Sequence, residues 1–176
     1  DVDGTGNVDF SDVLSAANLA IGKYVGIPPR VPFQDWAANV NGGNVVNVLD
    51  VIGIVNMSLD RTPSPSPPQA PITVSLNRNL ATREWEVKVS NAKGLAGVQF
   101  EIPATATLSK GPLASGWNLN KNIVKGKLRV IAYSPNAAGI SANAGVLLRL
   151  SGITGAPKIT NKVFSDANGN AMPAFP

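Results

Sequence analysis

The chain has 176 residues, of which 44% are hydrophobic and 15% are charged, so its composition favours one or two globular domains over a disordered chain. It contains no cysteine and no histidine, which excludes disulfides, thiol and imidazole catalysis, and the usual zinc sites. The net charge of +4 is uneven: residues 1–61 hold three basic and seven acidic residues, whereas residues 72–176 hold twelve basic and four acidic. The basic residues are scattered with little aromatic interleaving, so we expect no nucleic-acid binding, and no apolar run is long enough to predict a membrane span.

The first twelve residues carry oxygen-bearing side chains at positions 1, 3, 5, 9 and 12, and glycine at position 6. This is the spacing of an EF-hand calcium loop, in which roughly six to eight oxygens surround the ion and Gly6 permits the sharp turn. Four carboxylates this close would repel one another without a cation. The alternative is an Asp- and Gly-rich turn that only caps the next helix. The ligands that we expect are Asp1, Asp3, Thr5, Asn7 through its carbonyl, Asp9 and Asp12.

Apolar residues recur with helical spacing from Phe10 to about Gly22, which predicts a helix with one apolar face. Residues 24–38 contain three prolines, and proline blocks a helix, so an ordered connector is predicted there. We expect Phe33 and Trp36 to pack on the helices. A second helix is predicted from Val48 to about Leu59, with Val51, Ile54, Val55 and Leu59 facing inward.

The pattern of loop and helix returns 38 residues later, because Asp12–Lys23 aligns with Asp50–Arg61 and pairs Asn18 with Asn56. The second loop would run from Asn39 to Asp50, but Asp50 is its only charged ligand, and the charge of the ligands tunes calcium affinity. We expect a weaker calcium site here, and a metal-free loop is the open alternative. Its ligands would be Asn39, Asn41, Val45 at the position equivalent to Asn7, Asn47 and Asp50.

Residues 62–71 are rich in proline and serine and predict a semi-rigid polyproline II linker. From Ile72 the apolar period changes to two, which predicts an antiparallel β-sandwich or jelly roll of six to nine strands. For Asp166–Asn170 we expect a tight turn before a last strand rather than a calcium loop. The recognisable strand segments are 72–76, 85–90, 95–102, 128–133, 146–150 and 159–164.

The two loop–helix repeats resemble a dockerin, the small calcium module of cellulosome-type and other secreted assemblies. The segments Ala-Gly-Val-Gln-Phe-Glu-Ile (96–102), Val-Ile-Ala-Tyr-Ser (130–134), Gly-Val-Leu-Leu-Arg-Leu (145–150) and 161–170 look like a cohesin-type β-sandwich, the receptor that dockerins bind. The resemblance implies an α+β chain in two domains: an all-α dockerin-like EF-hand repeat pair (1–61), a linker (62–71), and an all-β antiparallel sandwich or jelly roll (72–176). The partner-binding positions that it implies are Phe10, Ser11, Ala17, Asn18, Val48, Leu49, Val55 and Asn56.

No catalytic constellation is found, because Glu84 and Glu86 would share one face of a solvated strand rather than flank a cleft. We therefore expect a non-catalytic extracellular assembly protein, with a protein partner of cohesin or dockerin type. That partner could be another copy, if the acidic module of one chain binds the basic sandwich of the next and builds filaments. The chain begins inside a motif, so we interpret it as a trimmed product of a secreted or cell-surface protein. The alternative is an anchoring or carbohydrate-binding module of a larger secreted enzyme, with Trp85, Trp117 or Tyr133 as a stacking platform.

Overall fold

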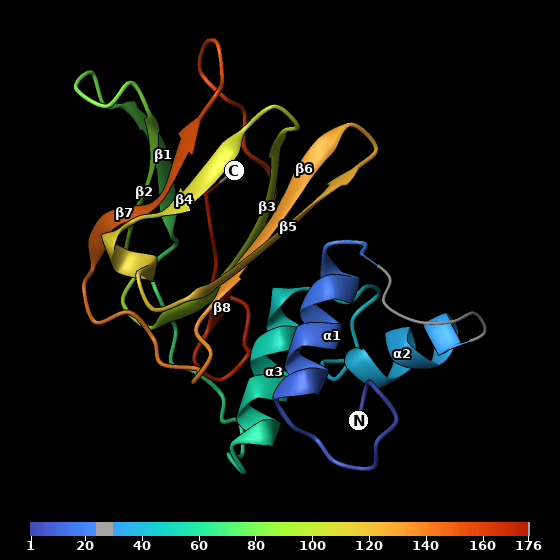
Figure 1. Cartoon of the computed structure of the whole chain (residues 1–176). Helices are drawn as coiled ribbons and strands as arrows, with labels where there is room; N and C mark the ends of the chain where they lie inside the picture. The colour runs from blue at the N-terminus through green and yellow to red at the C-terminus, as the bar shows by residue number, and fades with distance from the viewer. Residues whose placement is uncertain (24–29, 176) are drawn as a thin grey trace.

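The computed structural model describes residues 1–23 and 30–175, and within them three helices lie at one end of a β-sandwich (Figure 1). The helices are α1 (Phe10–Ala20), α2 (Arg30–Ala38) and α3 (Val48–Ser58). The predictions of α1 and α3 are confirmed to within two residues at each end. Leu59, which was expected to face inward, is exposed, so that part of the prediction is wrong.

Helix α2 contradicts the prediction of a proline-rich connector over its own residues, while the part of that connector at 24–29 lies outside the described residues. Pro32 is the third residue of α2. In the first turn of a helix a proline costs little, because the backbone N–H groups there have no carbonyl partner to lose. The expected packing of Phe33 and Trp36 is also wrong, since their side chains are 47% and 75% exposed.

Eight strands form two four-stranded sheets, and every paired strand runs antiparallel to its neighbour. The sheets have the orders β1-β2-β7-β4 and β5-β6-β3-β8, and their facing sides enclose one apolar core. The predicted sandwich is therefore confirmed. The strands are β1 (Thr73–Arg78), β2 (Trp85–Ser90), β3 (Leu95–Pro103), β4 (Thr107–Lys110), β5 (Asn118–Val124), β6 (Lys127–Tyr133), β7 (Ala144–Ser151) and β8 (Thr160–Asp166).

Strands β4 and β5 were not among the recognised segments, and both lie at a sheet edge. The β5 sequence, Asn-Leu-Asn-Lys-Asn-Ile-Val, is rich in asparagine, and asparagine is depleted in strands. Pairing with β6 holds this segment in the sheet despite its weak intrinsic preference, so the neighbour decides the structure.

A second apolar core lies between the helices and the outer face of the β5-β6-β3-β8 sheet. It joins the inner faces of α1 and α3 to Ala96 on β3 and to Ile131 and Tyr133 on β6. The chain therefore places its helical part directly on its own sandwich, as Figure 1 shows. No helix in the described part of the chain is long and apolar enough to cross a membrane.

Residues 62–71 have neither helical nor strand structure, and they run beside the turn that follows β8. The Asn170 side chain donates a 2.9 Å hydrogen bond to the Ser64 carbonyl, and the Ser66 hydroxyl donates to the Asp166 carboxylate. The prediction of a turn at 166–170 is confirmed: Gly169 adopts a positive φ of 85°, and Ser165 and Ala171 form a β-bridge across the turn. An isolated bridge replaces the expected last strand.

Candidate calcium loops and the helix–sheet interface

The first loop brings three of its predicted ligands together. Carboxylate oxygens of Asp1, Asp3 and Asp12 lie within 4.8 Å of one another, although the first and last are eleven positions apart in sequence. Asp1 is exposed, Asp3 is half-buried and Asp12 is buried. The group is therefore open to solvent on one side and anchored in the protein on the other.

Asp12 closes the first loop. Its carboxylate accepts hydrogen bonds from the backbone N–H groups of Val2, of Asp3 at 3.1 Å and of Asp9 at 2.9 Å. The bond from Asp9 is one half of a capping box, and in the other half the Asp9 carboxylate accepts from the Asp12 N–H. The same carboxylate also accepts from the Ser11 N–H at 2.7 Å. Because Asp9 serves as the N-cap of α1, its carboxylate is not part of the group of three.

The exposed end of the loop is ordered by Asp1, whose carboxylate accepts from the N–H groups of Gly4, Thr5 and Gly6 at 2.7–3.0 Å. Hydrogen bonds from Ser11 and Thr5 lower the pKa of Asp3, so its carboxylate is readily ionised. Thr5 and Asn7 are both exposed in this part of the loop.

The donor set of the first loop suits a hard divalent cation. Three carboxylates converge on one point, and calcium prefers carboxylate and carbonyl oxygens held by a flexible loop. The positive φ values of Gly4 and Gly6 supply the turns that this convergence requires.

The second loop is closed in the same way, by an aspartate at its twelfth position, but it has asparagines where the first loop has its other aspartates. Asp50 accepts from the N–H groups of Asn41 at 3.1 Å and Asn47 at 3.0 Å, and Asn47 caps α3 by accepting from Leu49. Burial raises the pKa of Asp50, which backbone hydrogen bonds offset only in part.

The asparagines of this loop are used within it. The Asn39 amide donates to the Gly43 carbonyl at 2.6 Å, the Asn41 oxygen accepts from the Gly43 N–H, and the Asn47 amide donates to the Val45 carbonyl at 3.2 Å. These hydrogen bonds of the Asn41 and Asn47 side chains therefore stabilise the conformation of the loop. Among the described residues, the group of converging carboxylates occurs at the first loop only.

Gly97 on β3 is where α3 meets the sheet. A methyl group built on Gly97 would lie 2.6 Å from Val48 Cγ2 and 3.1 Å from Ile52 Cγ1, so any side chain here would push the helix away. One turn further along α3, the Asn56 amide donates a 2.9 Å hydrogen bond to the Ala167 carbonyl at the end of β8. The contact is close, apolar at its centre and fixed in register by one polar bond.

The predicted partner-binding residues differ in how far this chain buries them. Ala17, Val48, Val55 and Asn56 are buried within this chain, and Leu49 is half-buried. The first three belong to the apolar cluster under the helices, so they are not available to an outside partner in this arrangement. Among the remaining predicted positions, Phe10 and Ser11 are exposed and Asn18 is half-buried.

Equivalent positions of α1 and α3 lie in different environments, exposed to solvent on α1 and buried against the sheet on α3. The alignment of the repeats pairs Phe10 with Val48 and Leu14 with Ile52. Val48 and Ile52 are fully buried on the sheet, whereas Phe10 and Leu14 are 48% and 39% exposed. The face by which α3 docks therefore has a counterpart on α1 that points to solvent.

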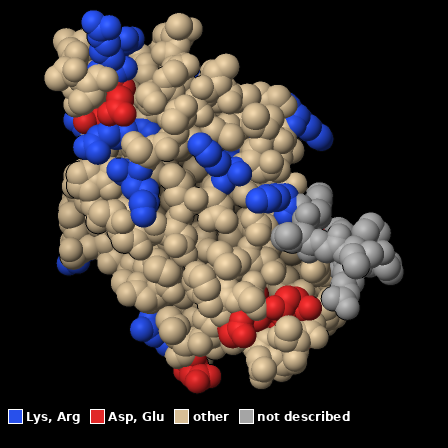
Figure 2. Space-filling model, in the orientation of Figure 1, with Lys and Arg blue, Asp and Glu red and all other residues tan. Residues whose placement is uncertain are grey.

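Within this chain, no ion pair among the described residues joins the helices to the sheet. Each ion pair among the described residues lies within the sandwich, between Glu86 or Glu101 and nearby lysines or arginines. On the face shown in Figure 2, the basic residues lie mostly in the upper part, over the sandwich, and two groups of acidic residues lie in the lower part of the picture. The side chain of Arg61 does reach the sandwich, but it donates to the Asn136 carbonyl.

The three aromatic residues named for the alternative of a carbohydrate-stacking platform are not fully exposed. Trp117 and Tyr133 are buried, and Trp85 is half-buried with the Arg78 guanidinium 5.6 Å from its ring centroid. The exposed tryptophan is Trp36 on α2, whose ring centroid lies 6.0 Å from that of Phe33.

The sequence predicted neither the close approach of α3 to Gly97 nor the exposure of the Trp36 side chain. A glycine inside a strand of otherwise large residues is a signal of close approach by another segment, and it was available in the Ala-Gly-Val-Gln run. The prolines before Trp36 led to the prediction of a connector, so helix α2, which carries Trp36, was missed.

No protein-family model matches this chain, and no curated protein matches it. Solved structures similar to it include a non-cellulosomal cohesin from the archaeon Archaeoglobus fulgidus, with 14% identity, a TM-score of 0.46, and coverage of 60% of this chain and 85% of that chain. The sixth cohesin of scaffoldin B from Acetivibrio cellulolyticus, solved in complex with a Cel5 dockerin, has 16% identity, a TM-score of 0.45 and coverage of 60% and 94%. A cohesin–dockerin complex from Clostridium thermocellum has 16% identity, a TM-score of 0.43 and the same coverage.

Proposed function

We propose that this chain is a non-catalytic, calcium-stabilised protein-interaction module of a secreted or cell-surface assembly. The observation that carries the proposal is the pair of equivalent helix faces. The α3 face is docked on the chain's own sandwich through Val48 and Ile52, and the matching α1 face, with Phe10 and Leu14, is exposed.

The exposed α1 face has the chemistry of a docking surface. Phe10 and Leu14 provide two large apolar side chains one turn apart, and the adjacent Ser11 and Asn18 provide hydrogen-bonding groups. A few large apolar anchors within a polar surround are typical of protein interfaces. The internal contact indicates what such a partner would offer: a sheet face with a glycine where the helix approaches.

Calcium would be held by Asp1, Asp3 and Asp12, with Thr5, the Asn7 carbonyl and Asp9 as the further predicted ligands. When bound, the ion supplies positive charge that offsets the repulsion among these carboxylates. Because Asp12 belongs to both the loop and α1, a fixed loop also fixes the start of α1, where Phe10 and Ser11 lie. Calcium binding to the folded state alone would raise stability by mass action. The second loop would bind calcium more weakly or not at all.

Self-assembly would require an exchange between copies. The sandwich face of each chain is covered by its own α3, so head-to-tail contacts form when the helical part of one copy docks on the sandwich of the next. Residues 62–71 have no helix or strand to break, which favours such an exchange. The exposed α1 face serves a partner in either case.

The decisive experiment compares the native chain with a Phe10→Asp, Leu14→Asp double variant as immobilised baits for secreted proteins of the source organism. In calcium we expect the native chain to capture a specific protein, and we expect the variant, or the native chain in chelator, to lose it. Thermal melts confirm that both baits are folded. Identical captured proteins on the two baits in calcium would overturn the proposed role of the α1 face.

Light scattering behind a sizing column tests the self-assembly route separately. Species larger than a monomer in calcium that revert to monomers in chelator would support exchange between copies. Monomers at every concentration in both conditions would exclude exchange between copies, and binding of a different protein would then be the remaining function of the module.

A further inference from the structure

The end of the sandwich that is farthest from the helices is formed by four loops. Strands β1, β3, β5 and β7 run away from the helical part, and each returns through a strand antiparallel to its neighbours. The connections that follow these four strands therefore lie at the same end of the molecule (Figure 1). The far-end loops, as we call them, comprise residues 79–84, 104–106, 125–126 and 152–159.

The far-end loops and the strand ends beside them are basic. Glu84 is the only acidic residue within these described loops, and it is half-buried. By contrast, residues 1–61 at the helical end hold seven of the eleven acidic residues of the chain. The molecule is therefore polarised, with positive charge at one end and negative charge at the other. The exposed cations of the far end are Arg78, Arg83, Lys125, Lys127 and Lys158.

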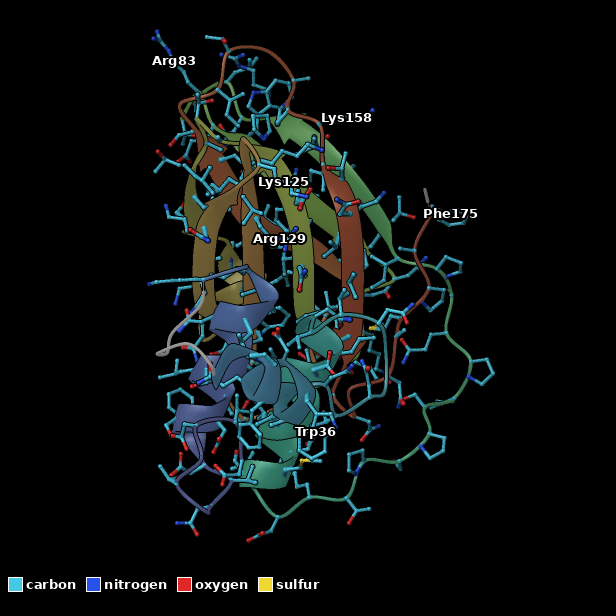
Figure 3. All side chains as sticks on the ribbon, turned by 90° about the vertical axis from the view of Figure 1, so that its right-hand side faces the viewer. Trp36, Arg83, Lys125, Arg129, Lys158 and Phe175 are labelled. Carbon is cyan, nitrogen blue, oxygen red and sulfur yellow. The ribbon has the colours of Figure 1, made fainter. Side chains whose placement is uncertain are left out.

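Most of this positive charge is not neutralised within the chain. Arg83, Lys125 and Lys158 take part in none of the ion pairs among the described residues, whereas Lys127 Nζ lies 3.9 Å from Glu101 Oε2. In Figure 3, Arg83 and Lys158 lie at the end farthest from the helices, with Lys125 somewhat lower. Cations without partners at one end of a protein create a positive potential that attracts and orients a negatively charged surface.

Two of the hairpins at this end carry an exposed aliphatic side chain beside the cations. Leu80 lies between Arg78 and Arg83 in sequence and is 83% exposed, the highest value among the large hydrophobic residues described. Ile123, two residues before Lys125, is 60% exposed. A soluble polyanion has no use for such side chains. At a lipid surface they enter the boundary between headgroups and acyl chains, where burial of apolar area adds to electrostatic attraction.

The cations are distributed over separate loops rather than directed at one point. Arg83 belongs to the hairpin of β1 and β2 in one sheet, Lys125 to the hairpin of β5 and β6 in the other, and Lys158 to the connection between the sheets. A small anion requires donors that converge, whereas an extended anionic surface can meet several loops at once. Near such a surface each lysine or arginine adds a similar small increment to the binding free energy.

We infer that the far-end loops bind the surface of an anionic lipid membrane, with Leu80 and Ile123 inserted among the headgroups and the cations against the lipid phosphates. In this orientation the helical end points away from the membrane, so the α1 face stays accessible to a protein partner. The inference is independent of the proposed function, because no residue of the far-end loops belongs to the α1 face or to either calcium loop.

Flotation of the full chain with lipid vesicles tests the inference, in chelator so that calcium does not bridge carboxylates to the lipid. We expect the chain to float with mixed phosphatidylcholine–phosphatidylglycerol vesicles but not with phosphatidylcholine alone, and to be released as salt rises. Arg83→Gln and Lys158→Gln should each lower the partition coefficient about fivefold, which corresponds to about 1 kcal/mol per cation. Leu80→Ser should lower it about tenfold, because the polar side chain gains little from leaving water.

Matched variants at the helical end are the controls. Lys23→Gln removes an exposed cation there, and Val45→Ser removes an exposed aliphatic side chain, and neither should change the partition coefficient. The Phe10→Asp, Leu14→Asp variant should also float like the native chain, so loss of a protein partner and loss of membrane binding are separate results.

Because Leu80, Arg83 and Lys158 are exposed, their variants are expected to fold normally, and thermal melts check this. The inference is overturned if the chain does not float with the anionic vesicles, or if it floats equally with neutral ones. It is also overturned if Leu80→Ser floats as well as the native chain. Binding to dextran sulfate without binding to vesicles would assign the far-end loops to a soluble polyanion instead.

Discussion

The two loop–helix repeats share one backbone plan and use it for different purposes. In each, a buried aspartate at the twelfth position accepts backbone N–H groups from the start and the ninth position of its loop, and a capping box begins the helix. The first repeat surrounds this plan with carboxylates and leaves its helix face exposed. The second replaces the carboxylates with asparagines and buries the equivalent face on the sheet. The same closure by a buried aspartate therefore occurs in a loop with converging carboxylates and in a loop without them.

The largest expected effect comes from the paired positions Ile52 and Leu14. Ile52→Ala should lower the free energy of unfolding by about 2–5 kcal/mol, because it opens a cavity between α3 and Gly97. Leu14→Ala removes a partly exposed side chain and should cost less than about 0.5 kcal/mol. Chemical denaturation in calcium measures both, and equal losses would contradict the different burial of the two faces.

The calcium response should depend on the first repeat alone. At a free calcium concentration about a hundred times the dissociation constant, the native chain should gain about 2.7 kcal/mol relative to the same chain in chelator. Asp3→Ala should abolish this difference, because it removes one of three converging carboxylates. Asn41→Ala, at the equivalent position of the second loop, should keep it.

Thermal melts in calcium and in chelator measure the effect for the native chain and both variants. A native melting temperature that chelator does not change would eliminate the first loop as a calcium site. A response lost in Asn41→Ala would show that the second loop contributes to binding.

Asn56 and Asn18 are also paired by the repeat, and only Asn56 reaches the sandwich in a hydrogen bond. Asn56→Ala should cost about 1–3 kcal/mol, because the Ala167 carbonyl loses its donor in a part-buried position. Asn18→Ala should change stability by less than about 0.5 kcal/mol. Denaturation curves of the two variants provide the comparison, and a larger loss in Asn18→Ala would contradict it.

The smallest expected effect is a difference in pH dependence, measured in chelator so that no metal competes with protons. The pKa of Asp50 is raised by burial, so its folded form holds a proton more readily than the unfolded chain, and stability falls as pH rises through the raised pKa. The pKa of Asp3 is lowered by hydrogen bonds, so its contribution is present above the ordinary value of 3.8 and is lost as pH falls.

Replacing each aspartate by asparagine removes its own part of the pH profile. Relative to the native chain, Asp50→Asn should gain melting temperature with rising pH across the acid range, and Asp3→Asn should lose less on acidification. Melting temperatures recorded from pH 3 upward test the opposite signs. Parallel changes in the two variants would refute the contrast.

The sequence by itself determined the features that depend on neighbours along the chain. The loop spacing, the two amphipathic helices, the duplication and the alternating strands are local patterns, and the structure contains the helices and the sandwich that they predict. Helix α2 was missed because a proline in a first turn leaves the same local signal as a proline that blocks a helix. Strand β5 was missed because its partner, rather than its composition, holds it in place.

Only the tertiary structure decided which of two similar helix faces is buried. Phe10 and Leu14 are as apolar as Val48 and Ile52, so nothing in the local sequence distinguishes the face that is buried from the face that is exposed. The choice depends on Gly97, which lies 39 residues beyond the end of α3 in sequence and leaves room for one helix to approach the sheet.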